Sequence, residues 1–241
     1  MVVYSFIFYL LYDRIFNKKQ SGNYKLFVTN KFREDSIDKG EYVLFLHTSL
    51  FEFYVTRDYL KGGKSDQVAA MEELCKVLGK LKMKLILRFH PNSRGSDERF
   101  KERLIKAALK YNPKTEIYHS EDLVDTYKLM QGAKVVLGTS TMGIVESIFC
   151  SVPSYYFSPA IYSRYLPTRH LNIHQESPRT LMDAIINPNK ILISEIRNAC
   201  LYYAEYNWLF NNINFSNTGI ETRSLRIPHA KNIRKYGHYT K

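Results

Sequence analysis

The sequence has few cysteines, and their placement excludes the usual disulfide and zinc frameworks. Its 241 residues include three, Cys75, Cys150 and Cys200, with no Cys-x-x-Cys pair. An odd number of widely spaced cysteines is untypical of disulfide-stapled folds and of zinc sites. The pattern favours a reducing compartment, and we therefore expect a cytoplasmic protein.

Long apolar runs are also lacking. The apolar opening at 2–11 is much shorter than the roughly 20 residues that a membrane-spanning helix needs. Asp13 and Arg14 follow it, where a secretion signal would have a small-residue cleavage site. We expect an ordinary helix here, or one that lies on a membrane surface.

Acidic residues are scarce relative to basic ones. Asp and Glu number 23 against 35 Lys and Arg, which gives a formal net charge of +12. This excess favours anionic partners such as phosphate-bearing small molecules, anionic lipids or nucleic acid. The basic residues are scattered and no nucleic-acid-binding motif is visible, so we expect no nucleic acid. An anionic inner-membrane surface remains a candidate partner for a peripheral protein.

From residue 41 onward, short β-branched and aromatic runs alternate with longer segments of helical periodicity, a pattern typical of a parallel sheet. We therefore predict an α/β fold with a Rossmann-like parallel sheet and helices on both faces. The predicted strands are 42–46, 84–89, 115–118, 134–137 and 154–157. The predicted helices are 66–81, 97–111, 123–130, 141–149, 178–187 and 191–210.

This alternation divides the chain into three predicted parts. Residues 1–40 form a helical or irregular N-terminal segment, and 41–190 form a Rossmann-like domain. Residues 191–241 form a long helix and a basic tail. The first segment is too short to be a second Rossmann-like domain.

Polar residues follow several predicted strands, where ligands bind in such sheets. The segments are His47-Thr48-Ser49, Arg88-Phe89-His90-Pro91-Asn92 and Gly138-Thr139-Ser140-Thr141. Small hydroxyls at a helix start suit a phosphate oxygen, and a glycine lets the backbone approach closely. The histidine before proline adds a hydrogen-bond donor for a departing phosphate.

Each of these residues also has a purely structural interpretation. Thr139 or Ser140 would cap the following helix whether or not phosphate binds. His90 would be a hydrogen-bonded loop residue, Glu52 a solvated acid at a helix start, and Glu146 a partner for a nearby base. The coincidence of polar clusters at successive strand ends favours the functional interpretation.

The stretch from about Tyr42 to Tyr165 resembles the nucleotide-binding, C-terminal half of GT-B capsular polysaccharide biosynthesis proteins. That group is similar to bacterial polysialyltransferases, Kdo transferases and CDP-glycerol glycerophosphotransferases. Three blocks carry the resemblance: Thr48-Ser49-Leu50-Phe51-Glu52-Phe53 with Ser65-Asp66-Gln67, then Arg88-Phe89-His90-Pro91-Asn92, then Gly138 to Glu146 with Pro153.

The resemblance implies roles for individual residues. His90 and Ser140 with Thr141 would hold the donor's phosphate, Glu146 would reach the ribose hydroxyls, and 120–127 would border the base. Thr139 is the alternative to Thr141, because the spacing to Glu146 is one residue longer than expected. The strand-end residues Ser49, Arg88, Asn92 and Gly138 complete the candidate binding set.

The catalytic base is where the sequence departs from the related enzymes. The acidic-acidic-Gly motif that accompanies His-Pro in bacterial sialyltransferases is absent. Glu52 is the best remaining acid, so the candidate catalytic residues are Glu52 and His90.

The resemblance implies an inverting glycosyltransferase of surface-polysaccharide synthesis. Its donor would be a CMP-, CDP- or UDP-linked sugar or polyol, and its acceptor a glycan or lipid-linked glycan. No cofactor is expected, and the lack of a tight Asp-x-Asp pair implies independence of metal ions. One alternative is a truncated or accessory nucleotide-sugar-binding protein that cannot turn over alone. A basic membrane or nucleic-acid module is a third interpretation, which rests on charge.

Overall fold

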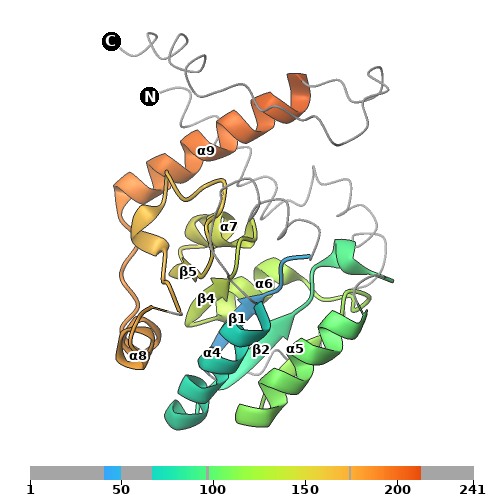
Figure 1. The fold of residues 1–241 in the computed structure, drawn as a ribbon. Helices are drawn as coiled ribbons and strands as arrows, with labels where there is room; N and C mark the ends of the chain where they lie inside the picture. Colours follow the sequence, from blue (N-terminus) through green and yellow to red (C-terminus); the bar gives the residue numbers. More distant parts are fainter. Residues whose placement is uncertain (1–40, 50–66, 96–97, 174, 213–241) are drawn as a thin grey trace. The chain divides into compact units, whose positions relative to one another are not determined.

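A computed structural model describes residues 41–49, 67–95, 98–173 and 175–212 of the protein. Within them the chain forms a five-stranded, fully parallel sheet (Figure 1). The strand order is β3-β2-β1-β4-β5. The bounds are β1 Tyr42–Leu46, β2 Lys84–Arg88, β3 Glu116–Tyr118, β4 Val135–Gly138 and β5 Ser154–Tyr156. This is the order of a Rossmann-like sheet, so the predicted fold class is confirmed.

The chain reverses its direction of travel across the sheet beside β1. After β1 it adds β2 and β3 on one side, and then it crosses over to add β4 and β5 on the other. Leu46, the last residue of β1, lies opposite both Arg88 of β2 and Gly138 of β4. The carboxyl ends of these three strands therefore lie at one edge, and the β1–β4 pair marks the topological switch point.

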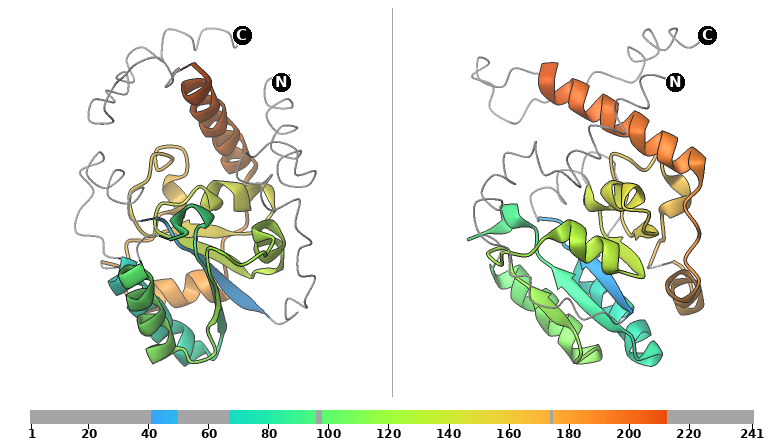
Figure 2. Two further views of the ribbon diagram at one scale, coloured as in Figure 1. Left: turned by 90° about the vertical axis from the view of Figure 1, so that its right-hand side faces the viewer. Right: turned by 180° about the vertical axis from the view of Figure 1, so that it is seen from behind.

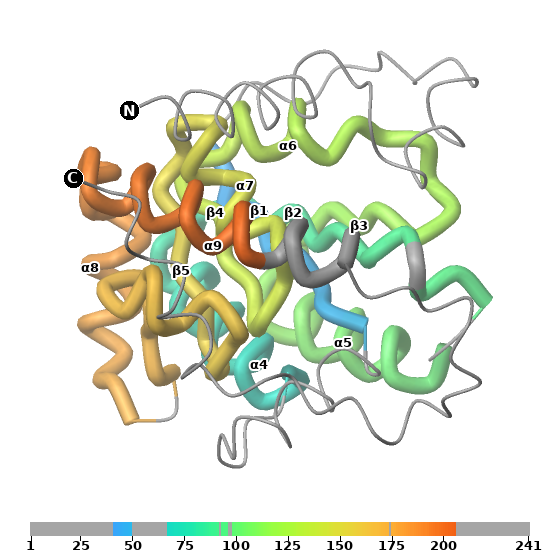
Figure 3. Tube along the Cα trace, turned by 90° about the horizontal axis from the view of Figure 1, so that it is seen from above, coloured from blue at the N-terminus to red at the C-terminus, as the bar shows by residue number. Residues whose placement is uncertain are grey.

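Helices cover both faces of the sheet, as Figures 2 and 3 show. In Figure 3, α4 (Gln67–Leu81) and α5 (Glu98–Tyr111) lie on one side of the sheet, and α6 (Thr126–Gly132) and α7 (Gly143–Phe149) lie on the other. A further helix, α8 (Pro178–Ile186), packs against α4. Alternate strand residues, such as Val43 and Phe45, enter the core shared by α4, α5 and α8.

Local sequence explains where two of the helices begin. Ser177 caps α8 by accepting from the Thr180 N–H at 3.2 Å, and Pro178 is its first residue. Asp125 caps α6 by accepting from the Tyr127 N–H at 2.9 Å. For this reason α6 begins at Thr126 and not, as the periodicity predicted, at residue 123.

The last helix, α9 (Ile193–Asn212), is joined to the preceding 3-10 turn, η2 (Pro167–Arg169), by a buried ion pair. Arg169 donates from Nε and an amino group to the two carboxylate oxygens of Glu195, at 2.7 and 2.6 Å. Glu195 also accepts from the Thr168 hydroxyl and the Leu192 N–H. Burial alone would raise the pKa of Glu195, but these hydrogen bonds outweigh it and lower the pKa.

Internal contacts divide the chain after Tyr203, within α9, so that the first unit holds the whole sheet. The predicted domain limits at residues 40 and 190 stay predictions, and segments 1–40 and 213–241 lie outside the described residues. Among the helices that the structure describes, none has the length and apolar character needed to cross a bilayer.

Candidate functional site

Most of the predicted site residues follow the ends of β1, β2 and β4. Ser49 follows β1, Arg88 ends β2 with His90 two residues on, and Gly138 ends β4 and leads into 139–141. Since these strands are neighbours and parallel, the structure brings the three segments to one edge of the sheet. Glu52 lies outside the described residues, as does the side chain of Asn92.

Hydrogen bonds among buried side chains join the ends of β1 and β4 across the switch point. The Thr139 hydroxyl lies 2.9 Å from Thr48 Oγ1 and 3.1 Å from Gln67 Oε1, and its one proton is shared between these two acceptors. Gln67 in turn donates from Nε2 to the Thr48 carbonyl oxygen at 3.0 Å. The Ser140 N–H donates to Thr48 Oγ1 at 3.3 Å. We call Thr48, Gln67, Thr139 and the Ser140 backbone the switch-point network.

This network changes how the hydroxyls of 139–141 are interpreted. Thr139 is fully buried and its proton is used within the protein. Thr141 accepts from the Gly143 N–H at 3.3 Å through Oγ1. In contrast, Ser140 Oγ is covered from solvent and has no hydrogen-bond partner in the described part of the chain.

The expectation that Thr139 or Ser140 caps the following helix is wrong. α7 begins at Gly143, its N-cap residue is Met142, and that residue makes no side-chain capping bond. The hydroxyl nearest to a capping role is that of Thr141. Since α7 starts two residues later than predicted, the Ser140 side chain is not needed for the helix start.

Gly138 is required by close packing inside the protein. A Cβ atom at this position would lie 2.7 Å from Thr141 Cγ2 and 3.1 Å from the Leu46 carbonyl oxygen. The second of these neighbours is backbone of the adjoining strand and cannot easily move. Whether a ligand also approaches Gly138 stays a prediction.

Arg88 makes its contacts to the protein backbone. Its side chain is buried, and its two amino groups donate to the carbonyl oxygens of His119 and, at 3.3 Å, Asp122. Burial is the main cause that lowers the pKa of Arg88 to about 10. The guanidinium therefore fixes the loop after β3, and the predicted part of Arg88 in binding the donor stays a prediction.

The backbone around His90 is held by a compact turn. The His90 carbonyl accepts from the Ser93 N–H at 2.9 Å and from the Ser93 hydroxyl at 2.7 Å. That hydroxyl also lies 2.8 Å from Ser120 Oγ, and Lys101 Nζ donates to the Ser93 carbonyl at 2.5 Å. These contacts fix the turn and leave the His90 ring partly exposed.

Glu146 lies in the first turn of α7 with only 8% of its surface exposed. The Tyr127 hydroxyl donates to Glu146 Oε1 at 3.2 Å. Tyr127 belongs to the stretch 120–127 that was predicted to border a nucleotide base. The structure thus joins two of the predicted segments through this one hydrogen bond.

Thr48 and Gln67 are the residues whose importance the sequence did not reveal. Both belong to segments that were noticed for their resemblance, but no role was assigned to either. The available signal was the position of Thr48 two residues after a strand. The hydrogen-bond partner of each side chain depends on the order of the strands in the sheet, and the local sequence pattern does not predict that order.

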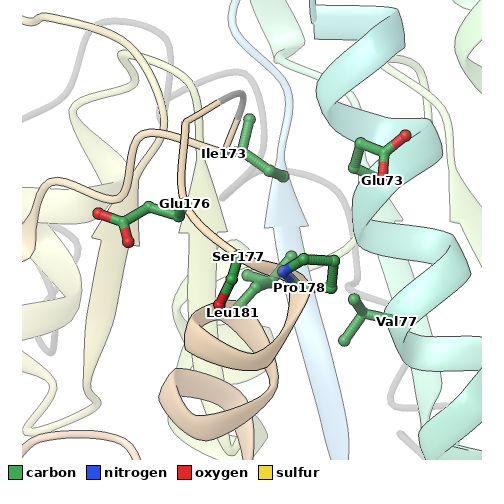
Figure 4. Close-up of a pocket in the computed structure, with 7 residues that line it drawn as sticks. All are labelled: Glu73, Val77, Ile173, Glu176, Ser177, Pro178 and Leu181. Carbon is green, nitrogen blue, oxygen red and sulfur yellow. The ribbon is translucent and has the colours of Figure 1, made fainter.

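A separate cavity of about 300 Å³ lies between α4 and α8 (Figure 4). Its walls are formed by Glu73, Val77, Ile173, Glu176, Ser177, Pro178 and Leu181. None of the residues predicted for the site lines it. The structure describes no group of three or more His, Cys, Asp or Glu residues that would hold a metal ion.

Comparison with known proteins finds similarity in structure alone. No family model and no curated protein matches the sequence. UDP-GlcNAc 2-epimerase from Methanocaldococcus jannaschii is 16% identical with a TM-score of 0.48, over 80% of this chain and 50% of that one. KpsC, a beta Kdo 2,4 transferase from Thermosulfurimonas dismutans, is 12% identical with a TM-score of 0.43, over 79% and 59%.

AviGT4, a glycosyltransferase involved in avilamycin A biosynthesis, is 13% identical with a TM-score of 0.43, over 77% of this chain and 56% of that one. The chain therefore spans between half and three fifths of the length of these three structures. The assignment of the fold rests on the strand order and on the helices that cover both faces.

Proposed function

We propose that this chain binds a nucleotide-activated sugar at the switch-point edge and acts as a glycosyltransferase of surface-polysaccharide synthesis. In sheets of this topology, ligands bind outside the carboxyl ends of the strands, where the strand order reverses. Each of the three blocks that resemble capsular polysaccharide biosynthesis proteins has described residues that follow one of these strands: Thr48 and Ser49 after β1, His90 and Pro91 after β2, and 139–141 after β4. The overall positive charge would help to collect an anionic donor.

The observation that carries the proposal is the state of the Ser140 hydroxyl. Its neighbours Thr139 and Thr141 use their hydroxyls inside the protein, while Ser140 Oγ is covered and unpaired among the described residues. Polar atoms shielded from water are nearly always paired, so an exception calls for an explanation. A phosphate oxygen bound at this edge would supply the partner.

The remaining assignments follow the resemblance. His90 would donate to the same phosphate and would stabilise it as it leaves the sugar. Glu146 would accept from the ribose hydroxyls, with its carboxylate oriented by Tyr127. Glu52 stays the candidate general base. The acceptor would be a glycan or a lipid-linked glycan, handled in the cytoplasm beside the anionic inner membrane.

Thermal unfolding with CMP, CDP, UDP and their sugar conjugates tests the proposal. A ligand that binds the folded state stabilises it by about 2.7 kcal/mol at a hundred times its Kd. We expect a raised Tm with at least one of these compounds. We expect Ser140→Ala and His90→Ala to reduce the rise, and Ser194→Ala, on an exposed α9 serine, to preserve it.

Two results would count against the proposal. If none of the compounds shifted the Tm at saturation, the chain would have no nucleotide site of the proposed kind. Equal shifts in wild type and Ser140→Ala would show that the Ser140 hydroxyl does not bind the ligand, so that its unpaired state would no longer support the proposal. Transfer of a labelled sugar to a glycan then separates an enzyme from an accessory binding protein, which would bind without turnover.

A further inference from the structure

His47, the first residue after β1, is almost completely buried, with 1% of its surface exposed. Its ring packs against Phe89 at 5.0 Å and Phe100 at 5.9 Å between centroids. The backbone N–H of His47 donates to the Arg88 carbonyl oxygen at 3.0 Å and so continues the pairing of β1 with β2. His47 therefore belongs to the same edge as the proposed site.

The hydrogen bonding of the His47 ring fixes its tautomer. Its Nδ1 accepts from the His90 backbone N–H at 3.5 Å. A backbone N–H can only donate, so Nδ1 carries no proton. Burial, and to a lesser extent the positive charges of His90 and Lys101, lower the pKa of His47 to about 3. The ring is neutral at pH 7, and its single proton lies on Nε2.

That Nε2–H group has no hydrogen-bond partner in the described part of the chain. The other buried polar side-chain atoms without a partner there are Arg88 Nε, Ser140 Oγ and His170 Nε2. Of these, Ser140 Oγ also follows a strand of the switch point. His47 and Ser140 thus place one unused polar atom after each of the two strands, β1 and β4, that pair there.

We infer that the Nε2–H of His47 is a further binding group of the site and donates a hydrogen bond to a phosphate oxygen of the nucleotide. This inference rests on the proposed function. A neutral imidazole fixed by its neighbours provides a donor whose direction does not change between about pH 5 and 8. His47 differs in this respect from His90, a partly exposed residue that is also predicted to donate to the phosphate.

Two substitutions separate this role from that of merely holding His90 in place. His47→Asn keeps an acceptor near the position of Nδ1 and removes the Nε2 donor. His47→Gln keeps a donor near the position of Nε2 and removes the Nδ1 acceptor. If Nε2–H binds phosphate, His47→Asn weakens CMP, CDP or UDP binding about ten- to a hundredfold and His47→Gln retains most of it.

Titration calorimetry on the full chain measures these affinities. The nucleosides cytidine and uridine, which lack the phosphate, serve as control ligands. We expect the loss in His47→Asn for the nucleotides and not for the nucleosides. Circular dichroism checks that both variants are folded. A ¹⁵N spectrum of the histidines gives an independent readout, in which nucleotide should shift the Nε2–H signal of His47.

The outcomes are distinct. No binding of any nucleotide by the wild type overturns both the proposed function and this inference. Binding by the wild type that is unchanged in His47→Asn, with an unshifted Nε2–H signal, overturns the inference alone. Loss in His47→Gln with retention in His47→Asn shows that His47 only positions His90, and also overturns it.

Discussion

Ser140 and Thr139 are adjacent in the chain, yet their hydroxyls have opposite surroundings. The Thr139 hydroxyl lies within hydrogen-bond distance of two acceptors, 91 and 72 residues away in the sequence. The Ser140 hydroxyl has no partner among the described residues. At this scale, the question for each polar residue is whether its hydrogen bonds are already made inside the protein.

For Thr139, that question gives a prediction about stability. Thr139→Val preserves the shape but removes the donor, so that the buried Gln67 Oε1 loses a hydrogen bond. We expect the free energy of unfolding to fall by about 1–3 kcal/mol in urea denaturation. Thr139→Ser, which retains the hydroxyl, is the matched control. A loss as large in Thr139→Ser as in Thr139→Val would show that the methyl group matters instead.

His47 gives a prediction about pH. Its pKa of about 3 in the folded protein lies below the ordinary value near 6.5 expected for the unfolded chain. Between these values the unfolded state binds a proton that the folded state does not. Stability is therefore fully present above pH 6.5 and is lost as the pH falls below it, by up to about 1.4 kcal/mol per pH unit.

Urea denaturation at pH 7 and pH 5 measures this loss. Comparison with His47→Phe isolates the contribution of His47, because His170 also has a lowered pKa and stays present in both proteins. Phenylalanine suits a position packed against Phe89 and Phe100. We expect the variant to lose less stability over this range, and identical losses would contradict a neutral buried His47.

Secondary-structure elements are joined in this protein by specific polar contacts as well as by apolar packing. The Arg169–Glu195 pair is the clearest example, because it fastens η2 to the first turn of α9 with both charges buried. Arg169 also donates to the carbonyl oxygens of Asn189 and Lys190, both at 3.0 Å. The segment before α9 is thereby held at several points.

Removing one charge should therefore weaken the protein strongly. We expect Glu195→Gln to lower the free energy of unfolding by about 3–5 kcal/mol, since Arg169 would remain buried without a counter-charge. The exposed pair Arg179–Asp183, at 4.0 Å in α8, provides the control. Asp183→Asn should change stability by less than about 0.5 kcal/mol. Similar effects of the two substitutions in chemical denaturation would refute the distinction.

The elements themselves were largely predictable from sequence, because apolar periodicity reports which face is buried. All five predicted strands agree with the structure to within one residue at each end. The starts of α6 and α7 were placed too early, by three and two residues. In both cases the apolar residues just before the helix, Leu123 and Val124 for α6 and Met142 for α7, are partly buried, so the apolar pattern continues beyond the hydrogen-bonded helix.

For the whole molecule, alternating strands and helices were sufficient to predict a parallel sheet but not the order of its strands. The site depends on that order. Thr48 and Thr139 are hydrogen-bonded because β4 pairs with β1 and not with β3, although β3 is the strand that precedes β4 in the sequence. The sequence therefore indicated which segments reach the edge, and it could not indicate which of their side chains would be used by the protein itself.

The switch-point network also has a direction, and one amide group sets it. Gln67 presents its oxygen to the Thr139 hydroxyl and its nitrogen to the Thr48 carbonyl. If this amide were turned around, Gln67 Oε1 would face the Thr48 carbonyl oxygen, and neither of these two oxygens can donate a hydrogen bond. The orientation of a single glutamine at the start of α4 therefore decides whether that helix attracts or repels the backbone that leaves β1.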